Sequence, residues 1–170
     1  MGTIVLVERL AGLVATDRAA GRTVALANGC FDLLHVGHAR YLKGAAAEAD
    51  RLVVAINDDR SVTVLKGPGR PIMPVAERAE LVACFEVVDY VIVFSELTVA
   101  PLLEALQPDV HCKGTDYTVE TVPEREIVRA YGGRTAIVGD TKDHSTHDVV
   151  SRITARHVTR ETAERGSREQ

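Results

Sequence analysis

The chain has 170 residues, of which 46% are hydrophobic and 26% are charged, a balance typical of one globular domain and not of a disordered or fibrous protein. Its net charge of −4 excludes a general electrostatic attraction to nucleic acid or to an anionic membrane, so any bound anion must be held by local groups. No apolar run approaches the ~20 residues of a membrane span and the N-terminus lacks the pattern of a signal peptide, which together predict a cytoplasmic protein.

An amphipathic helix between Val5 and Ala20 is the first predicted element. Its apolar side chains recur at helical spacing, at Leu6, Leu10, Leu13 and Val14. Further helical patterns lie between the later strands, in HARYLKGAAAEA, PVAERAELVACF, VAPLLEAL and PEREIVRAYGG.

Short runs rich in valine and isoleucine indicate buried strands: TVALAN (23–28), RLVVAIN (51–57), DYVIVF (89–94), DVHCK (109–113) and RTAIVG (134–139). Strand and helix alternate, which predicts an α/β fold: a single Rossmann-like domain with a five-stranded parallel sheet flanked by helices on both faces. We expect this domain to occupy residues 1–155 and the polar stretch 156–170 to be a frayed helix or a disordered tail.

The stretch NGCFDLLHVGH (28–38) stands where the first of these strands runs into a helix. His35, Gly37 and His38 therefore fall near a helix N-terminus, where unpaired backbone N–H groups and the helix dipole favour an anion. Gly37 lets a ligand approach the backbone closely. A purely structural role of the two histidines stays open as the alternative.

A metal site is disfavoured by the pattern around these residues. No carboxylate or thiolate completes a familiar zinc motif beside the histidines, so no metal ligand is predicted. The three cysteines, Cys30, Cys84 and Cys112, are scattered and form no CxxC pair, which favours reduced thiols that fill space.

Cationic and hydroxyl side chains recur after other predicted strands, in LKGPGRP (65–71), HCKGTDY (111–117) and GDTKDHSTHD (139–148). Ligands of parallel sheets bind outside the carboxyl ends of the strands, so we expect these loops to converge. Each side chain alone could be an ordinary solvated residue, but their joint placement favours a phosphate site. The candidates are the mobile charges Lys66 and Lys113, the planar guanidinium groups of Arg70 and Arg78, and the hydroxyls of Ser145 and Thr146.

These motifs resemble a known family. HVGH (35–38) is similar to the H-x-G-H signature of the nucleotidyltransferase superfamily with a cytidylyltransferase-like fold. Within it, NGCFDLLHVGHARYL, LKGPGRPIMPVAERAELV, VDYVIVF, PDVHCKGTDYT and DHSTHDVVSRI resemble the heptose 1-phosphate adenylyltransferases, and the resemblance covers residues 3–154. Many members are fused to a sugar kinase, which is absent from this sequence, so a stand-alone enzyme is expected.

The resemblance implies a reaction. The oxygen of D-glycero-D-manno-heptose 1-phosphate attacks the α-phosphorus of ATP, giving ADP-heptose and pyrophosphate for lipopolysaccharide core or another surface glycan. Such a transfer depends on alignment and charge compensation around the phosphorus. Mg²⁺ is expected to bridge the triphosphate oxygens, and the family expectation for assembly is a homodimer.

The resemblance also implies residue roles. Catalytic groups would be His35 and His38, which donate hydrogen bonds to the triphosphate and the transition state, with Lys66 reaching the phosphates. Nucleotide-binding residues would be Cys30, Phe31, Gly37, Ser145 and Thr146, and sugar phosphate ligands would be Asp32, Arg78 and Lys113.

One departure from the family pattern concerns the nucleotide. Relatives usually carry S-T-T at the start of the last helix, where this chain has Ser145, Thr146 and His147. An imidazole thus replaces a hydroxyl that could bind phosphate. The residues leave ATP, CTP and GTP open, and adenine follows from the resemblance alone.

Two other interpretations stay open. The first is the same chemistry with another nucleotide or acceptor, as in a glycerol 3-phosphate cytidylyltransferase or a guanylyltransferase that forms GDP-heptose. The second is a nucleotide-sensing module that binds without turnover. The joint presence of His35, His38, Lys66 and Lys113 in loops that are expected to converge argues against the second.

Overall fold

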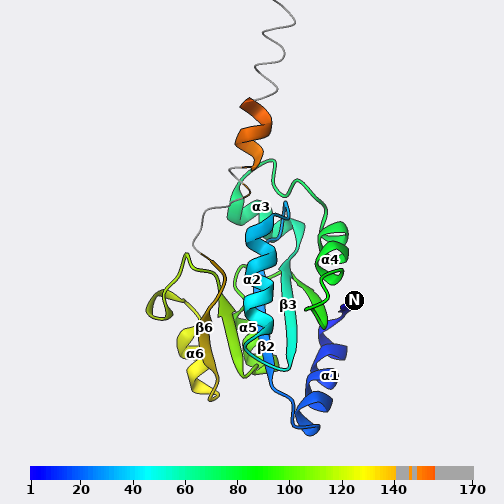
Figure 1. Cartoon of the computed structure of the whole chain (residues 1–170), viewed down its shortest axis with the longest axis vertical. Helices are drawn as coiled ribbons and strands as arrows, with labels where there is room; N and C mark the ends of the chain where they lie inside the picture. Colours follow the sequence, from blue (N-terminus) through cyan, green and yellow to red (C-terminus); the bar gives the residue numbers. More distant parts are fainter. Residues whose placement is uncertain (141–145, 147–148, 156–170) are drawn as a thin grey trace, which may run out of the picture.

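A six-stranded parallel sheet lies at the centre of the molecule, with the strand order β1-β4-β3-β2-β5-β6 (Figure 1). The strands are β1 (Thr3–Val5), β2 (Val24–Gly29), β3 (Arg51–Asn57), β4 (Tyr90–Phe94), β5 (Val110–Lys113) and β6 (Arg134–Ile137). The computed structural model describes residues 1–140, 146 and 149–155, so the predicted polar tail at 156–170 lies outside the described residues.

Helices cover both faces of this sheet, as the alternating pattern predicts. They are α1 (Val7–Ala19), α2 (Val36–Ala46), α3 (Asp59–Lys66), α4 (Val75–Ala83), α5 (Ala100–Leu106) and α6 (Arg125–Ala130), with one 3-10 turn, η1 (Val119–Thr121). Buried side chains of α2 and α4 pack on one face of the sheet. Those of α1, α5 and α6 pack on the other, which gives the three layers of a doubly wound domain.

The prediction of five strands is wrong by one, because β1 adds an edge strand beside β4, with Ile4 opposite Val91. This strand is three residues long and runs directly into a helical apolar pattern. That pattern predicts a helix from Val5, whereas α1 begins at Val7. A second element that the periodicity does not predict is α3, whose N-terminus is capped by Asp58 accepting the N–H of Ser61 at 2.7 Å.

The strand order creates a crevice between β2 and β5. From β2 the chain builds outward in one direction through β3 and β4, and later in the other through β5 and β6. Neighbouring connections therefore leave on opposite sides at this point, and such a switch point is where parallel sheets bind ligands. The last paired residues of the two strands are Ala27 and Cys112.

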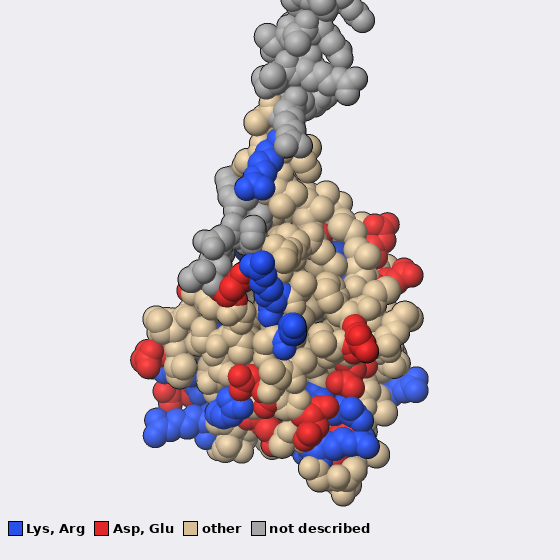
Figure 2. All heavy atoms as spheres, in the orientation of Figure 1, with Lys and Arg blue, Asp and Glu red and all other residues tan. Residues whose placement is uncertain are grey.

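The amino ends of the strands carry a network of ion pairs instead. The Asp17 carboxylate, 3% exposed, accepts hydrogen bonds from Arg22, Arg51 and the Tyr90 hydroxyl, at 2.8, 3.2 and 2.8 Å. On the face shown in Figure 2, side chains of both signs are interspersed, most densely at the end away from α3. No helix among the described residues is long and apolar enough to cross a membrane.

Candidate active site

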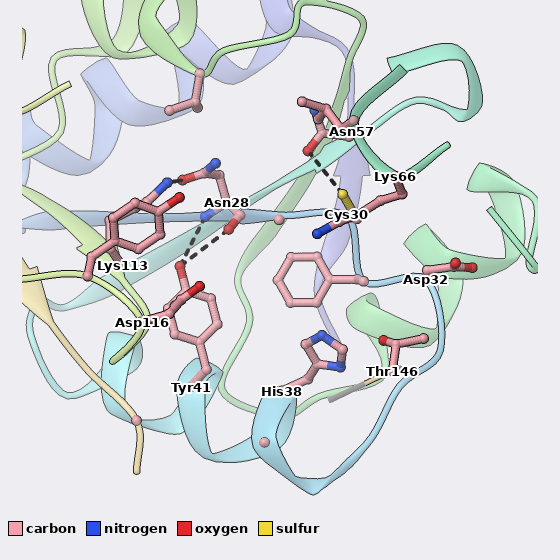
Figure 3. Close-up of a pocket in the computed structure, with 18 of the residues that line it drawn as sticks. Asn28, Cys30, Asp32, His38, Tyr41, Asn57, Lys66, Lys113, Asp116 and Thr146 are labelled. Atoms are coloured by element: carbon pink, nitrogen blue, oxygen red, sulfur yellow. Dashed lines mark hydrogen bonds between the residues drawn. The ribbon is translucent and has the colours of Figure 1, made fainter. Parts of the chain in front are cut away.

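A cleft of about 970 Å³ opens at the carboxyl ends of the strands. Its walls come from the loop between β2 and α2, the end of α3, the turn after β4, the segment after β5 and the end of β6. Figure 3 shows two groups of side chains in it: Lys113, Asn28 and Tyr41 on one side, and His38 and Lys66 on the other. Segments far apart in the sequence therefore meet in one site, as the loop positions predict.

The β2–α2 loop turns sharply before it enters α2. Phe31 has a positive φ of 47°, in the left-handed region that side chains other than glycine rarely adopt. Its ring is buried and packs against the ring of His38, with 5.2 Å between the two ring centroids. A strained backbone of this kind is characteristic of sites where geometry serves function.

The two histidines of the motif lie against each other at the start of α2. His35 is the N-cap residue, and its ring centroid is 3.9 Å from that of His38. The backbone N–H of His35 donates to Nδ1 of His38 at 3.3 Å. Because Nδ1 accepts this bond, the proton of the neutral ring is on Nε2, which makes Nε2 a donor available to the cleft.

His38 is neutral at physiological pH. Burial and the neighbouring His35 lower the pKa of His38 to about 4. The ring therefore serves as a hydrogen-bond donor of fixed tautomer rather than as a cation. Such a donor can stabilise charge on a phosphate oxygen without itself being titrated near pH 7.

Asp32 anchors a second loop to the first. Its carboxylate accepts the backbone N–H groups of Ile72 and Met73 at 2.6 and 3.2 Å, and its other oxygen lies 2.6 Å from Nε of Arg70. The anchored segment, 67–73, contains two glycines with positive φ, so its path requires these residues. This anchoring holds Lys66 and Arg70 at the cleft, where both contribute to the lining.

Arg78 lies beneath the cleft, and its side chain is 0% exposed. From α4 its guanidinium donates to the carbonyls of Cys30, Asn57 and Met73 at 2.5, 2.8 and 3.0 Å, and to the Asp59 carboxylate at 2.7 Å. It thus ties together both loops, the end of β3 and the start of α3. This position corrects the expectation that Arg78 presents its guanidinium to the sugar phosphate, because the group is buried and donates four hydrogen bonds to protein acceptors.

Lys113 stands at the carboxyl end of β5, on the β5 side of the crevice. Its side chain is largely buried, and its ammonium lies 4.8 Å from the centroid of the Tyr117 ring. Burial lowers the pKa of Lys113, and the nearby carboxylates of Glu124 and Asp116 oppose that shift. A cation held in this way suits a phosphate ligand.

The structure brings most of the predicted site residues together. Those that line the cleft are Cys30, Phe31, Asp32, His35, Gly37, His38, Lys66, Lys113 and Thr146. Arg78 supports the cleft from below. Ser145 and His147 lie outside the described residues.

Sequence reasoning missed several residues that line or support this cleft. Asn28 and Asn57 lie at the carboxyl ends of β2 and β3. Tyr41 is in α2, and Glu124 is the N-cap residue of α6. His111 is buried below Asn28, 3.1 Å from its side-chain oxygen. The signal for the two asparagines was their position at strand ends, whereas Tyr41, Glu124 and His111 are placed by tertiary structure.

Comparisons with known proteins place the chain in a family. A family model described as cytidylyltransferase-like matches residues 26–164. Two curated relatives are named bifunctional protein HldE. The one from Syntrophotalea carbinolica is 44% identical, and the match covers 88% of this chain and 31% of that relative. The one from Azotobacter vinelandii is 47% identical, and the match covers 86% of this chain and 31% of that relative. The chain therefore spans less than a third of these relatives.

A solved structure shows the same fold. The crystal structure of the lipopolysaccharide core biosynthesis protein from Thermoplasma volcanium is 28% identical to this chain, with a TM-score of 0.57. The match covers 69% of this chain and 94% of that protein. The similarity thus extends over nearly the whole of that neighbour.

Proposed function

The chain belongs to the cytidylyltransferase-like family, and on that premise we propose that it transfers AMP from ATP to D-glycero-D-manno-heptose 1-phosphate, giving ADP-heptose and pyrophosphate. The observation that carries the proposal is the convergence of His35, His38, Lys66 and Lys113 on one cleft. The choice of adenine and heptose is supported by the resemblance of the NGCFDLLHVGH and KGTDY segments and by the similarity to the HldE proteins.

The proposed transfer is one in-line displacement. An oxygen of the sugar 1-phosphate attacks the α-phosphorus, the bond from that phosphorus to the bridging oxygen breaks, and pyrophosphate leaves. In this account Nε2–H of His38 donates to the phosphoryl group, Lys66 and Arg70 hold the triphosphate, and Lys113 holds the acceptor. Positioning and charge stabilisation then supply most of the rate enhancement.

Magnesium is proposed to enter with the nucleotide. Among the residues that the structure describes, no group of three or more His, Cys, Asp or Glu side chains could hold a metal ion. This suits Mg²⁺, which is commonly bound through substrate phosphates and water with few protein ligands. When bound, the ion neutralises charge on the triphosphate.

The experiment that tests the function is a matrix of pyrophosphate-release assays. ATP, CTP, GTP and UTP are each offered heptose 1-phosphate, glycerol 3-phosphate or no acceptor, with Mg²⁺ present. We expect release with ATP and heptose 1-phosphate together. Release with CTP and glycerol 3-phosphate, or with GTP and the heptose, would transfer the mechanism to the alternative substrates, and nucleotide binding without release would favour the sensing module.

A homodimer and a cytoplasmic location complete the proposal. The apolar side chains of Val64, Leu65 and Ile72 are exposed near the cleft and offer a surface that a second copy would cover. Light scattering of the purified protein measures the mass in solution. Cell fractionation of the source organism checks the location.

A further inference from the structure

Asn28, at the carboxyl end of β2, is held by two side chains of β5. Nε2 of His111 lies 3.1 Å from Oδ1 of Asn28, and Nζ of Lys113 lies 3.4 Å from the same oxygen. Both come from alternate positions of one strand and therefore from one face of the sheet. Figure 3 shows Lys113 and Asn28 side by side in the cleft.

These contacts fix both the amide orientation and the histidine tautomer. A lysine ammonium only donates, so the Asn28 atom that faces Lys113 is the oxygen. His111 faces that oxygen too, and its Nε2 must carry the proton. The Asn28 amide therefore directs its NH₂ group away from β5, and Asn28 lines the cleft.

His111 occupies a position where a hydrocarbon side chain would be expected. It is 0% exposed, and its neighbour on β2 is the core residue Leu26. Its Nδ1 is buried and has no hydrogen-bond partner among the described residues. The contact with Asn28 is thus the polar interaction that the structure records for this imidazole, which burial and Lys113 keep neutral by lowering its pKa to about 3.

The backbone of Asn28 is fixed from the opposite side of the sheet. The hydroxyl of Tyr41 accepts from the N–H of Asn28 at 3.3 Å and donates to the carbonyl of Cys112 at 2.8 Å. It bridges β2 and β5 directly after their last paired residues. The side chain and the main chain of Asn28 therefore both have hydrogen-bond partners at the switch point.

We propose that Asn28 binds the phosphate of the acceptor. Its NH₂ group and the Lys113 ammonium form one pair of hydrogen-bond donors, and His111 is the positioning residue of this pair. Such a pair offers donors and no acceptor to the cleft, which matches the oxygens of a phosphate monoester. The inference rests on the proposed function and names the acceptor subsite within it.

Two substitutions of His111 separate positioning from packing. His111→Leu removes the Nε2 donor but fills an apolar layer, so we expect unchanged or higher thermal stability with a tenfold or greater loss of kcat/KM for heptose 1-phosphate. His111→Gln keeps a donor at similar reach and should restore kcat/KM to within about threefold. The KM for ATP should change less than about twofold in both, and Val110→Ala, a core change in the same strand, should lower stability without a loss specific to the acceptor.

The inference is wrong if His111→Leu keeps full activity, if His111→Gln is as impaired as His111→Leu, or if kcat/KM for ATP falls as much as kcat/KM for heptose 1-phosphate.

Nitrogen NMR of the imidazole provides a measurement that is independent of turnover. We expect the neutral Nε2–H tautomer of His111 from pH 5 to 8, and the Asn28 NH₂ resonances should shift when heptose 1-phosphate is added. An Nδ1–H tautomer or an unmoved Asn28 signal would overturn the inference even if pyrophosphate release is observed, whereas these signals without any release would contradict the proposed function alone.

Discussion

A histidine in a phosphate site can act as a cation, as a base or as a neutral donor, and its surroundings decide which. His38 is neutral because burial and His35 both disfavour its charged form, and its tautomer is set by the His35 N–H that Nδ1 accepts. A neutral donor strengthens its interaction as negative charge accumulates on the phosphoryl oxygen. If the proposed function holds, we expect His38 to contribute more to stabilising the transition state than to binding the nucleotide.

Removal of the His38 imidazole should separate turnover from binding. We expect His38→Ala to lower kcat by about 10²–10³-fold, the range for loss of one donor to developing charge, while the Kd for ATP rises less than about fivefold. Steady-state pyrophosphate release gives kcat, and calorimetry with ATP gives Kd. Lys43→Ala, at an exposed position of the same helix, is the control, and equal losses of kcat and affinity would count against this role.

At the scale of elements, the site consists of two loops, the β2–α2 loop and the segment 67–73, which are held in place by buried side chains. Asp32 fastens the segment 67–73 to the β2–α2 loop, and Arg78 connects both loops to β3 and α3. Arg78 has no exposed side-chain atoms and serves the cleft through the groups that it holds, whereas Asp32 both lines the cleft and anchors the segment 67–73. A charged side chain buried in this way must keep all its partners, because removing one leaves an uncompensated polar group.

Arg78→Lys should show how far the loops depend on that support. Lysine cannot reach the four acceptors of the guanidinium, so we expect the free energy of unfolding to fall by about 3 kcal/mol and kcat/KM to fall at least tenfold. Urea denaturation and the pyrophosphate assay measure the two effects. Arg60→Lys, at an exposed position of α3, should match the wild type, and a stable, fully active Arg78→Lys protein would refute the supporting role.

The patterns in the sequence predict elements better than they predict contacts. The runs of valine and isoleucine indicate β2 to β6 to within about two residues, because strands buried on both faces have a strong signal. The short edge strand β1 has no such signal. Likewise the motif locates His35 and His38, but the distinction between Asp32 as a ligand and Asp32 as an anchor depends on the segment 67–73, which lies 40 residues further along the chain.

On the scale of the whole molecule, the two ends of the sheet have different tasks. The carboxyl ends hold the cleft, whereas the amino ends hold the ion pairs around Asp17. Burial raises the pKa of Asp17, but hydrogen bonds from Arg22, Tyr90 and Arg51 outweigh it and the net shift is downward. The carboxylate therefore stabilises the fold above its unfolded pKa, and this contribution is lost as the pH falls through the folded pKa.

Asp17→Asn should affect stability without affecting chemistry. At pH 7 we expect the free energy of unfolding to fall by about 2–4 kcal/mol, with kcat/KM unchanged. The difference from the wild type should shrink as the pH falls below the ordinary pKa of an aspartate and through the lowered pKa of folded Asp17, where the wild-type carboxylate becomes protonated. Denaturation at several pH values measures this, with Glu8→Gln on the exposed side of α1 as the charge-matched control; a loss of kcat/KM in Asp17→Asn would contradict the division between the two ends.

This cleft is proposed to join a nucleoside monophosphate to a sugar phosphate, and phosphorus NMR of the reaction follows the new bond itself. The protein is incubated with ATP, heptose 1-phosphate and Mg²⁺. We expect the monoester signal of the sugar phosphate to be replaced by the coupled pair of a diphosphate diester, with one pyrophosphate per product, and His38→Ala to slow this change by about 10²–10³-fold. An unaltered sugar phosphate signal, or release of inorganic phosphate without a new diester, would contradict the proposed transfer.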